Sequence, residues 1–196
     1  MRLPLIYLVL AVFPGILQAQ APDANHAAIN GHVIGEPVSR FLRLEQDARE
    51  DVDVCRHNSI RASCQGLLAA VDSGGRTEVS TETSRDLDNP DKPVISIEFV
   101  LDKGKVVKVT LPVDDVADIA KKFGAPTRES VVPAQNASGA KWDDRLTVWE
   151  SPGIYVTLYQ DNNPTAQDHR PLLVMESTEE HAREETAAHV QNVATQ

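Results

Sequence analysis

The sequence predicts an α+β protein, with an antiparallel sheet that carries short helices on one face in two imperfect helix–sheet repeats. Two stretches support this fold class. Residues 95–111 alternate apolar and polar side chains on both sides of a glycine-containing turn, the pattern of a β-hairpin. Residues 114–123 follow directly and carry an apolar residue every three or four positions, the pattern of a short amphipathic helix. Short helices alternating with paired antiparallel strands indicate an α+β architecture.

The predicted hairpin has apolar side chains on one face of each strand. The turn at 102–104 ends in Gly104, which tolerates the positive φ that hairpin loops with a bulge require. The alternating apolar residues are Ile95, Ile97, Phe99 and Leu101, then Val107, Val109 and Leu111. One face of this hairpin is therefore expected to lie in the core.

The predicted helix at 114–123 has start and stop signals at its two ends. Asp114 is a suitable N-cap, and two lysines lie in the last turn near the negative end of the helix dipole. Gly124 suits the left-handed position after the helix, and Pro126 prevents its continuation.

The N-terminal residues have the pattern of a secretory signal. Residues 1–19 contain one arginine, an apolar stretch shorter than the ~20 residues needed to span a bilayer, and a small-residue end at Ala19. We therefore expect cleavage after Ala19, no membrane insertion afterwards, and a periplasmic or secreted location. Residues 20–34 are polar and alanine-rich, and we predict a flexible leader there.

Cys55 and Cys64 are the two cysteines of the chain, and the sequence places both in one predicted loop. In an exported protein such a pair predicts a disulfide, worth roughly 2.5–3 kcal/mol by the chain-entropy argument. A metal site with His57 lacks further nearby ligands, and a redox pair would need Cys-x-x-Cys spacing.

The remaining chain forms one predicted α+β domain at 35–178, with halves at 35–111 and 112–178. The sequence predicts a helix at 36–46, a hairpin at 67–81, a surface loop at 81–93, and strands at 145–150, 154–159 and 171–176. Residues 128–141 are expected to be mostly connection, with a short strand at 130–132. Residues 179–196 are charged and lack an apolar stripe, so a loose tail is predicted.

The charge balance excludes some partners. The chain has 19 Lys and Arg against 29 Asp and Glu, a formal net charge of −10. This composition argues against nucleic acid and anionic membrane surfaces as partners, because both require basic patches. The sequence also has no phosphate-binding loop, zinc-protease motif or nucleophile-elbow motif, and it predicts no cofactor, no metal and no catalytic residues.

Strand parity selects a candidate binding face. A two- or four-residue loop around 151–153 would place Trp149 on the same face as Ile154, Val156 and Leu158, which we assign to the core beneath the 114–123 helix. The opposite face is the candidate binding face, since amphipathic aromatic side chains are common at protein interfaces. Its residues are Leu146, Val148, Tyr155, Thr157 and Tyr159. The alternative is that the 81–93 loop or the tail covers this face.

The second half of the chain resembles a unit found in small bacterial envelope proteins. It combines a helix, Gly124-x-Pro126, and a sheet that contains Trp142 and Trp149. This arrangement, over residues 95–159, resembles the repeats of the small outer-membrane-assembly lipoprotein and of the β-lactamase inhibitor protein. It is also similar to uncharacterised exported bacterial proteins of this size. The resemblance implies a repeated helix–sheet fold that binds another protein.

These observations favour a non-enzymatic, exported protein-binding module of the cell envelope or medium. The alternative is a hydrolase or small-ligand-binding protein whose site is assembled from scattered residues. A pocket with converging polar groups would favour the alternative, whereas an open, partly aromatic sheet face would favour the protein-binding module.

Overall fold

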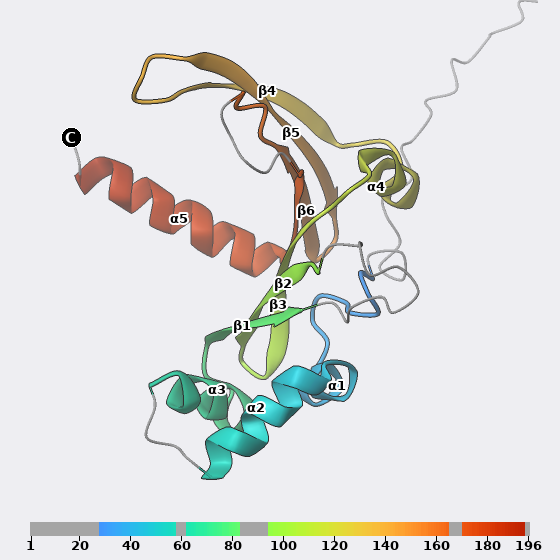
Figure 1. Cartoon of the computed structure of the whole chain (residues 1–196), viewed down its shortest axis with the longest axis vertical. Coiled ribbons are helices and arrows are strands. Elements are labelled where there is room, and N and C mark those ends of the chain that lie inside the picture. Colours follow the sequence, from blue (N-terminus) through green and yellow to red (C-terminus); the bar gives the residue numbers. More distant parts are fainter. Residues whose placement is uncertain (1–27, 58–61, 83–93, 165–169, 195–196) are drawn as a thin grey trace, which may run out of the picture.

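A computed structural model describes residues 28–57, 62–82, 94–164 and 170–194 of the chain. Within these ranges, five helices and seven strands form one α+β unit (Figure 1). The helices are α1 (Val38–Leu44), α2 (Gln46–His57), α3 (Ala62–Ser73), α4 (Val116–Phe123) and α5 (Thr178–Ala194). The strands are β1 (Thr77–Glu82), β2 (Ser96–Asp102), β3 (Lys105–Pro112), β4 (Arg128–Gln135), β5 (Lys141–Ser151), β6 (Ile154–Gln160) and β7 (Leu172–Ser177).

All the strands pair antiparallel in one sheet of order β1-β2-β3-β7-β6-β5-β4. The first half of the chain supplies the meander β1–β2–β3, and the second half supplies β4–β5–β6. The last strand, β7, enters between β3 and β6 and joins the two meanders into a single sheet. The prediction of an α+β fold with an antiparallel sheet is confirmed.

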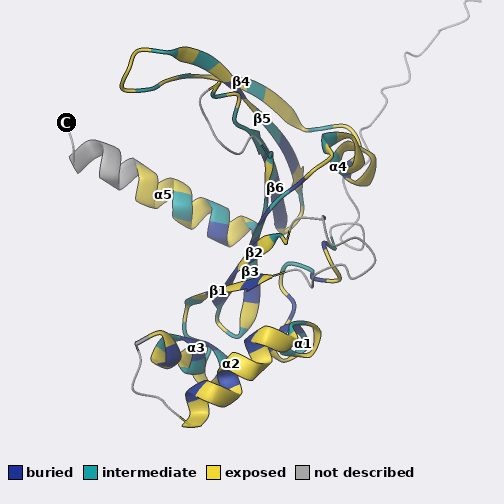
Figure 2. Ribbon diagram, viewed as in Figure 1, coloured by how far each residue is buried: buried dark blue, intermediate teal, exposed yellow. Residues whose placement is uncertain are grey.

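One face of the sheet, the helical face, packs against α1–α4. Phe99 on β2 contacts Phe41 of α1 at a ring-centroid distance of 4.9 Å, and Phe123 of α4 lies 5.6 Å from Trp149 of β5. The Trp149 indole nitrogen donates a hydrogen bond of 3.0 Å to the carbonyl of Gly124. Figure 2 shows the buried residues along the strands and the inner sides of these helices. The placement of Trp149 in the core beneath the 114–123 helix is therefore confirmed.

The predicted hairpin and helix in the middle of the chain are present. β2 and β3 pair through a tight turn in which Lys103 and Gly104 have φ of 52° and 73°. Gly124 ends α4 with φ of 73°, a positive value that favours glycine. The N-cap is Asp115, whose carboxylate accepts from the Ala117 amide at 2.7 Å, so the helix begins one residue later than predicted from Asp114.

The Cys55–Cys64 disulfide is present, with its two Cα atoms 5.0 Å apart. The predicted loop around it is wrong, because Cys55 belongs to α2 and Cys64 to α3. The predicted hairpin at 67–81 is also wrong in its first strand. Cys64, Leu67 and Ala70 are buried at a spacing of three, which is a helical stripe, and β1 pairs with β2 instead.

The prediction of a flexible leader at 20–34 is wrong for residues 28–34, the part of it that the structure describes. Ile29 and His32 are buried, and His32 is inaccessible to solvent. Its ring nitrogens lie 2.6 Å from a Glu36 oxygen and 2.8 Å from a Glu45 oxygen. Carboxylates only accept, so both contacts are hydrogen bonds when both ring nitrogens carry a proton. Arg40 also binds Glu36 at 2.5 Å, and this polar network fixes the segment onto α1 without an apolar pattern in the sequence.

The predicted loose tail is also wrong, because Thr178–Ala194 forms α5 on the opposite side of the sheet from α4 (Figure 1). The helices are therefore not all on one face. The predicted connection at 128–141 is instead mostly β4, an edge strand with exposed Val131 and Val132. Most side chains of β4 are exposed, which explains why the apolar alternation is weak there.

Some predictions concern segments that the structure does not describe. The signal at 1–19, the first part of the leader, and residues 83–93 of the predicted surface loop lie outside the described residues. Among the helices that are described, none has the length and apolarity needed to cross a membrane.

Candidate functional site

The five residues of the predicted binding face lie on the same side of the sheet, which we call the α5 face. Leu146 pairs with Tyr159, and Val148 pairs with Thr157, in the register that the strand-parity argument required. Tyr155 lies two residues before Thr157 and projects to the same side. The structure therefore brings the predicted residues together.

Helix α5 and the Arg128 side chain of β4 cover part of this face. The Tyr155 ring stacks on His181 of α5 with a centroid distance of 3.5 Å, and its hydroxyl accepts a hydrogen bond of 2.8 Å from Arg128. Burial raises the pKa of Tyr155. Val148 is also buried, so the exposed part of the predicted face is limited to the half-buried Leu146, Thr157 and Tyr159. The C-terminal segment thus covers the predicted face at Tyr155, as the alternative interpretation of this face expected.

Tyr159 belongs to a polar cluster at the C-terminal end of β6. The Tyr159 hydroxyl donates to one Asp144 oxygen at 2.5 Å, and the backbone amide of Asn162 donates to the other at 3.0 Å. These hydrogen bonds lower the pKa of Asp144, and the bond to Asp144 raises the pKa of Tyr159 to about 12. The cluster fixes the Tyr159 ring and links the start of the 161–164 turn to β5.

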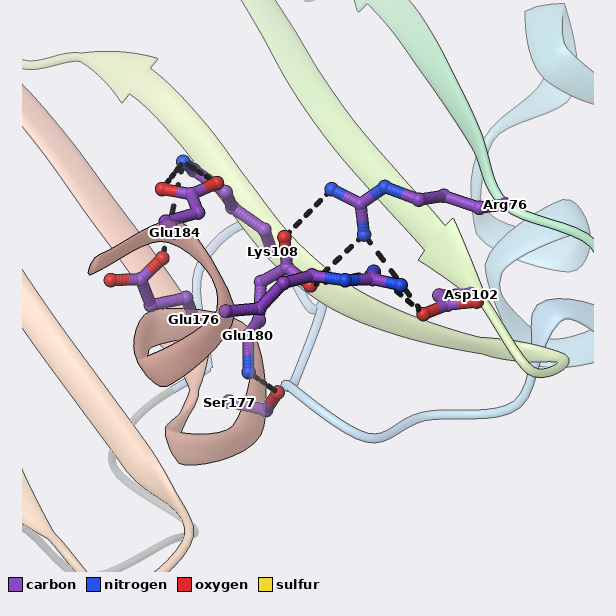
Figure 3. A network of polar contacts seen from close by, with 8 residues as sticks. Arg76, Asp102, Lys108, Glu176, Ser177, Glu180 and Glu184 are labelled. Carbon is purple, nitrogen blue, oxygen red and sulfur yellow. Dashed lines mark hydrogen bonds and ion pairs between the residues drawn. The ribbon is translucent and has the colours of Figure 1, made fainter. Parts of the chain in front are cut away.

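Helix α5 is attached to the sheet by ion pairs (Figure 3). The Arg76 guanidinium donates to both Glu180 oxygens, at 2.9 and 2.7 Å, and Glu180 is only 3% exposed. Burial opposes ionisation of Glu180, but the hydrogen bonds and charge of Arg76 outweigh it and lower the pKa of Glu180. Arg183 adds a hydrogen bond of 3.1 Å to Asp102 at the end of β2.

A second set of charges lies one turn further along α5 (Figure 3). Lys108 of β3 donates to both oxygens of Glu184 at 2.6 and 2.7 Å, and one Glu176 oxygen lies 3.9 Å from the same ammonium group. The other Glu176 oxygen contacts the His181 ring at 2.7 Å. Burial raises the pKa of Glu176, and the hydrogen bond from His181 offsets only part of this effect.

The start of α5 has a sequence signal that our predictions missed. Ser177 and Glu180 have the spacing of a capping box, and the Ser177 hydroxyl accepts from the Glu180 amide at 3.1 Å (Figure 3). This motif marks a helix start even where no apolar stripe follows. It identifies the tail as helical, although it does not reveal that Arg76 is its partner, 104 residues away.

A groove of about 390 Å³ lies between α5 and the sheet on the α5 face. Its apolar lining includes Val100 of β2 and Leu172 and Val174 of β7. Its polar lining includes Glu78, Ser80, Glu98, Lys108, Thr110 and Glu184. Because Leu172 pairs with Tyr159 and Val174 with Thr157, the groove floor continues into the exposed part of the predicted binding face. We call this combined surface the α5 groove.

A groove of about 520 Å³ lies on the helical face, between α4 and strands β4–β6. Its lining includes Trp149 and Leu158 from the core, and Val131 of β4, which is 59% exposed. Glu129 and Arg145 contribute one charge of each sign to its lining. This groove has no marked charge preference and contains none of the tyrosines of the predicted face.

The described side chains do not form an evident catalytic or metal centre. Among them, no group of three or more histidine, cysteine or acidic side chains is placed to hold a metal ion. The His181–Glu176 pair has the chemistry of a general base, but its ring is stacked against Tyr155 and its second nitrogen lies 3.5 Å from Glu185. The pair therefore serves to anchor α5.

Comparison with known proteins adds no relative. No family model, curated protein or solved structure matches this chain. The geometry and charge of the α5 groove are therefore the basis for assigning a function.

Proposed function

We propose that this protein is an exported, non-enzymatic protein-binding module whose partner places an extended segment in the α5 groove. The observation that carries the proposal is the continuity of the groove floor with the half-buried residues Leu146, Thr157 and Tyr159. Such a surface, partly apolar and partly aromatic with a polar border, has the composition of protein interfaces.

The dimensions of this surface suit a peptide segment. Its floor crosses five neighbouring strands, β2, β3, β7, β6 and β5. Four strand spacings of about 4.8 Å make roughly 19 Å, the length of about six residues of extended chain. A band of this length across an antiparallel sheet exceeds what one small substrate occupies, and it favours a segment of another protein.

The disulfide supports the exported location in this proposal. Cys55 and Cys64 are joined, and such bonds persist in oxidising compartments. The signal-like sequence at 1–19 is consistent with the same route. N-terminal sequencing of the natural protein tests it, since export predicts a chain that begins at Gln20.

Photo-crosslinking tests the binding surface. A benzophenone amino acid at Leu172, which is 37% exposed in the α5 groove, should crosslink a partner protein in cells that produce the natural chain. The matched control is the same substitution at Leu44 of α1, which is 47% exposed and lies outside the groove. Mass spectrometry of the crosslinked product would identify the partner segment.

The comparison between the two positions decides the outcome. A product that forms at Leu172 and not at Leu44 supports the proposed function. Equal crosslinking at both positions, or a product at Leu44 alone, would contradict the assignment of the groove as the binding surface.

A further inference from the structure

We infer that the partner segment in the α5 groove is basic as well as apolar, with a lysine or arginine placed against Glu78 and Glu98. This inference rests on the proposed function and names the chemistry of its partner.

Glu78 and Glu98 are two exposed carboxylates at the β1–β2 end of the groove. Glu78 pairs with Val100, and Glu98 pairs with Ser80, so the two carboxylates are diagonal neighbours on one face of adjacent strands. Neither has a hydrogen bond or ion pair to another residue in the described ranges. Two like charges at this separation repel each other, and a cation between them would relieve the repulsion.

The basic side chain that lines the groove does not neutralise these glutamates. Lys108 is bound by both oxygens of Glu184, at 2.6 and 2.7 Å, and it also lies 3.9 Å from Glu176. The groove lining therefore contains three carboxylates, Glu78, Glu98 and Glu184, against one ammonium group, a difference of two negative charges. The unpaired charge is concentrated at the β1–β2 end.

The apolar floor separates this site from a simple acidic surface. Val100 is buried directly beside the two glutamates, and Val174 and Leu172 continue the floor towards β6. A ligand that binds here must place a cation at one end and apolar side chains along the rest. In an extended peptide, side chains at alternate positions project to the same side, which meets this requirement with a basic residue followed by apolar residues at every second position.

A peptide-binding measurement tests the inference. The probe is a fluorescein-labelled hexapeptide, Lys-Ser-Leu-Ser-Leu-Ser, whose lysine and leucines project to the same side of an extended chain. It is titrated into the full mature chain, and binding is followed by fluorescence anisotropy. Two matched peptides replace either the lysine by glutamate or the leucines by serine. We expect binding of the basic apolar peptide, and at least tenfold weaker binding of both others.

Two variants locate the binding site. The double variant Glu78→Gln and Glu98→Gln should bind the basic peptide about tenfold more weakly, which corresponds to about 1.4 kcal/mol. The control, Asp47→Asn with Asp51→Asn, makes the same change of net charge on exposed positions of α2. It should leave the affinity within about twofold, since exposed charges beyond a Debye length are screened at physiological salt. Melting temperatures of both variants should match that of the unchanged chain.

Each outcome has a defined meaning. No binding of the basic peptide, or equal weakening by both variant pairs, would overturn the inference, because the attraction would be absent or a general property of an acidic surface. A partner that crosslinks at Leu172 through an acidic or uncharged segment would also overturn it, while leaving the proposed function intact. Binding that persists when leucine is replaced by serine would show that the floor is not used, and would likewise reject it.

Discussion

The two faces of the sheet are held to their helices by different forces. On the helical face, aromatic and aliphatic side chains such as Phe99 and Trp149 pack against α1–α4. On the α5 face, the helix is attached by the ion pairs of Glu180 and Glu184, by the hydrogen bond between His181 and Glu176, and by one aromatic stack on Tyr155. Apolar packing is a short-range, non-directional force, whereas the attachment of α5 depends on charge and therefore on pH and salt.

The largest expected loss of stability comes from removing the indole of Trp149 from the core. Trp149→Ala should lower the free energy of unfolding by about 3–5 kcal/mol, because it leaves a cavity beside Phe123 and removes the hydrogen bond to Gly124. Urea denaturation followed by circular dichroism measures this change. Trp142→Ala, on the same strand but only half-buried, is the control and should cost clearly less. Equal losses would mean that the helical face is not the dominant core.

The disulfide should contribute less to the free energy of unfolding than the indole of Trp149. Replacing Cys55 and Cys64 by serine should cost roughly 2.5–3 kcal/mol, the entropy regained by an unfolded chain without the ring. Reduction of the unchanged protein should give the same loss in a thermal melt. A reduced protein as stable as the oxidised one would contradict a structural role.

Removal of α5 should have an intermediate effect that salt reduces. A chain ending at Ser177 loses the Arg76–Glu180 and Lys108–Glu184 pairs, and we expect a loss of about 2 kcal/mol at low ionic strength. The difference from the full chain should shrink in 1 M salt. An unchanged melting temperature would support the loose tail that the sequence had predicted.

A pair of single substitutions separates buried from exposed charge. Glu180→Gln removes a carboxylate that is 3% exposed, so it should destabilise by about 1 kcal/mol and loosen α5. Asp118→Asn breaks the exposed Lys121–Asp118 pair on α4 and should have no measurable effect. Because the pKa of Glu180 is lowered, its contribution is present above the ordinary carboxyl pKa and is lost as the pH falls through the folded-state value.

The smallest expected effect on stability is that of Glu176, whose pH dependence has the opposite sign to that of Glu180. The pKa of Glu176 is raised by burial, so its contribution to stability is full at low pH and declines as the pH rises through the folded-state pKa. Glu176→Gln should therefore be neutral or slightly stabilising at pH 8, by under about 1 kcal/mol, and the difference should vanish near pH 4. Urea titrations at the two pH values check this. A loss of stability at pH 8 would show that the carboxylate charge is needed to hold His181.

The same contrast explains what the sequence could predict. Alternation along 95–111 and the stripe of α4 report apolar burial, and parity across Pro152-Gly153 correctly separated Trp149 from Tyr155. The attachment of α5 and of His32 could not be predicted, because ion pairs and buried hydrogen bonds leave no periodic pattern. The partner of Glu180 is Arg76, which directly precedes β1 and lies 104 residues away in the sequence, so only the fold brings them together.

The candidate site shows the same limit. Parity identified Leu146, Thr157 and Tyr159 as one surface, but it did not place α5 over Tyr155 or identify the groove beside it. The acidic end combines Glu78 of β1 with Glu98 of β2, two strands that the predicted hairpin at 67–81 did not pair with each other. A wrong strand partner thus concealed the charged half of the site.

The position of β7 has a consequence for the growing chain during synthesis. β7 is the last strand to be made, yet it lies in the middle of the sheet, with β3 on one side and β6 on the other. Until residues 172–177 are available, the chain holds two separate meanders whose inner strands have open hydrogen-bonding edges. Open edges of this kind invite pairing with other chains. A chain that stops before β7 is therefore expected to depend on a chaperone or on an unfolded export route, and only a chain that includes residues 172–177 can close this sheet.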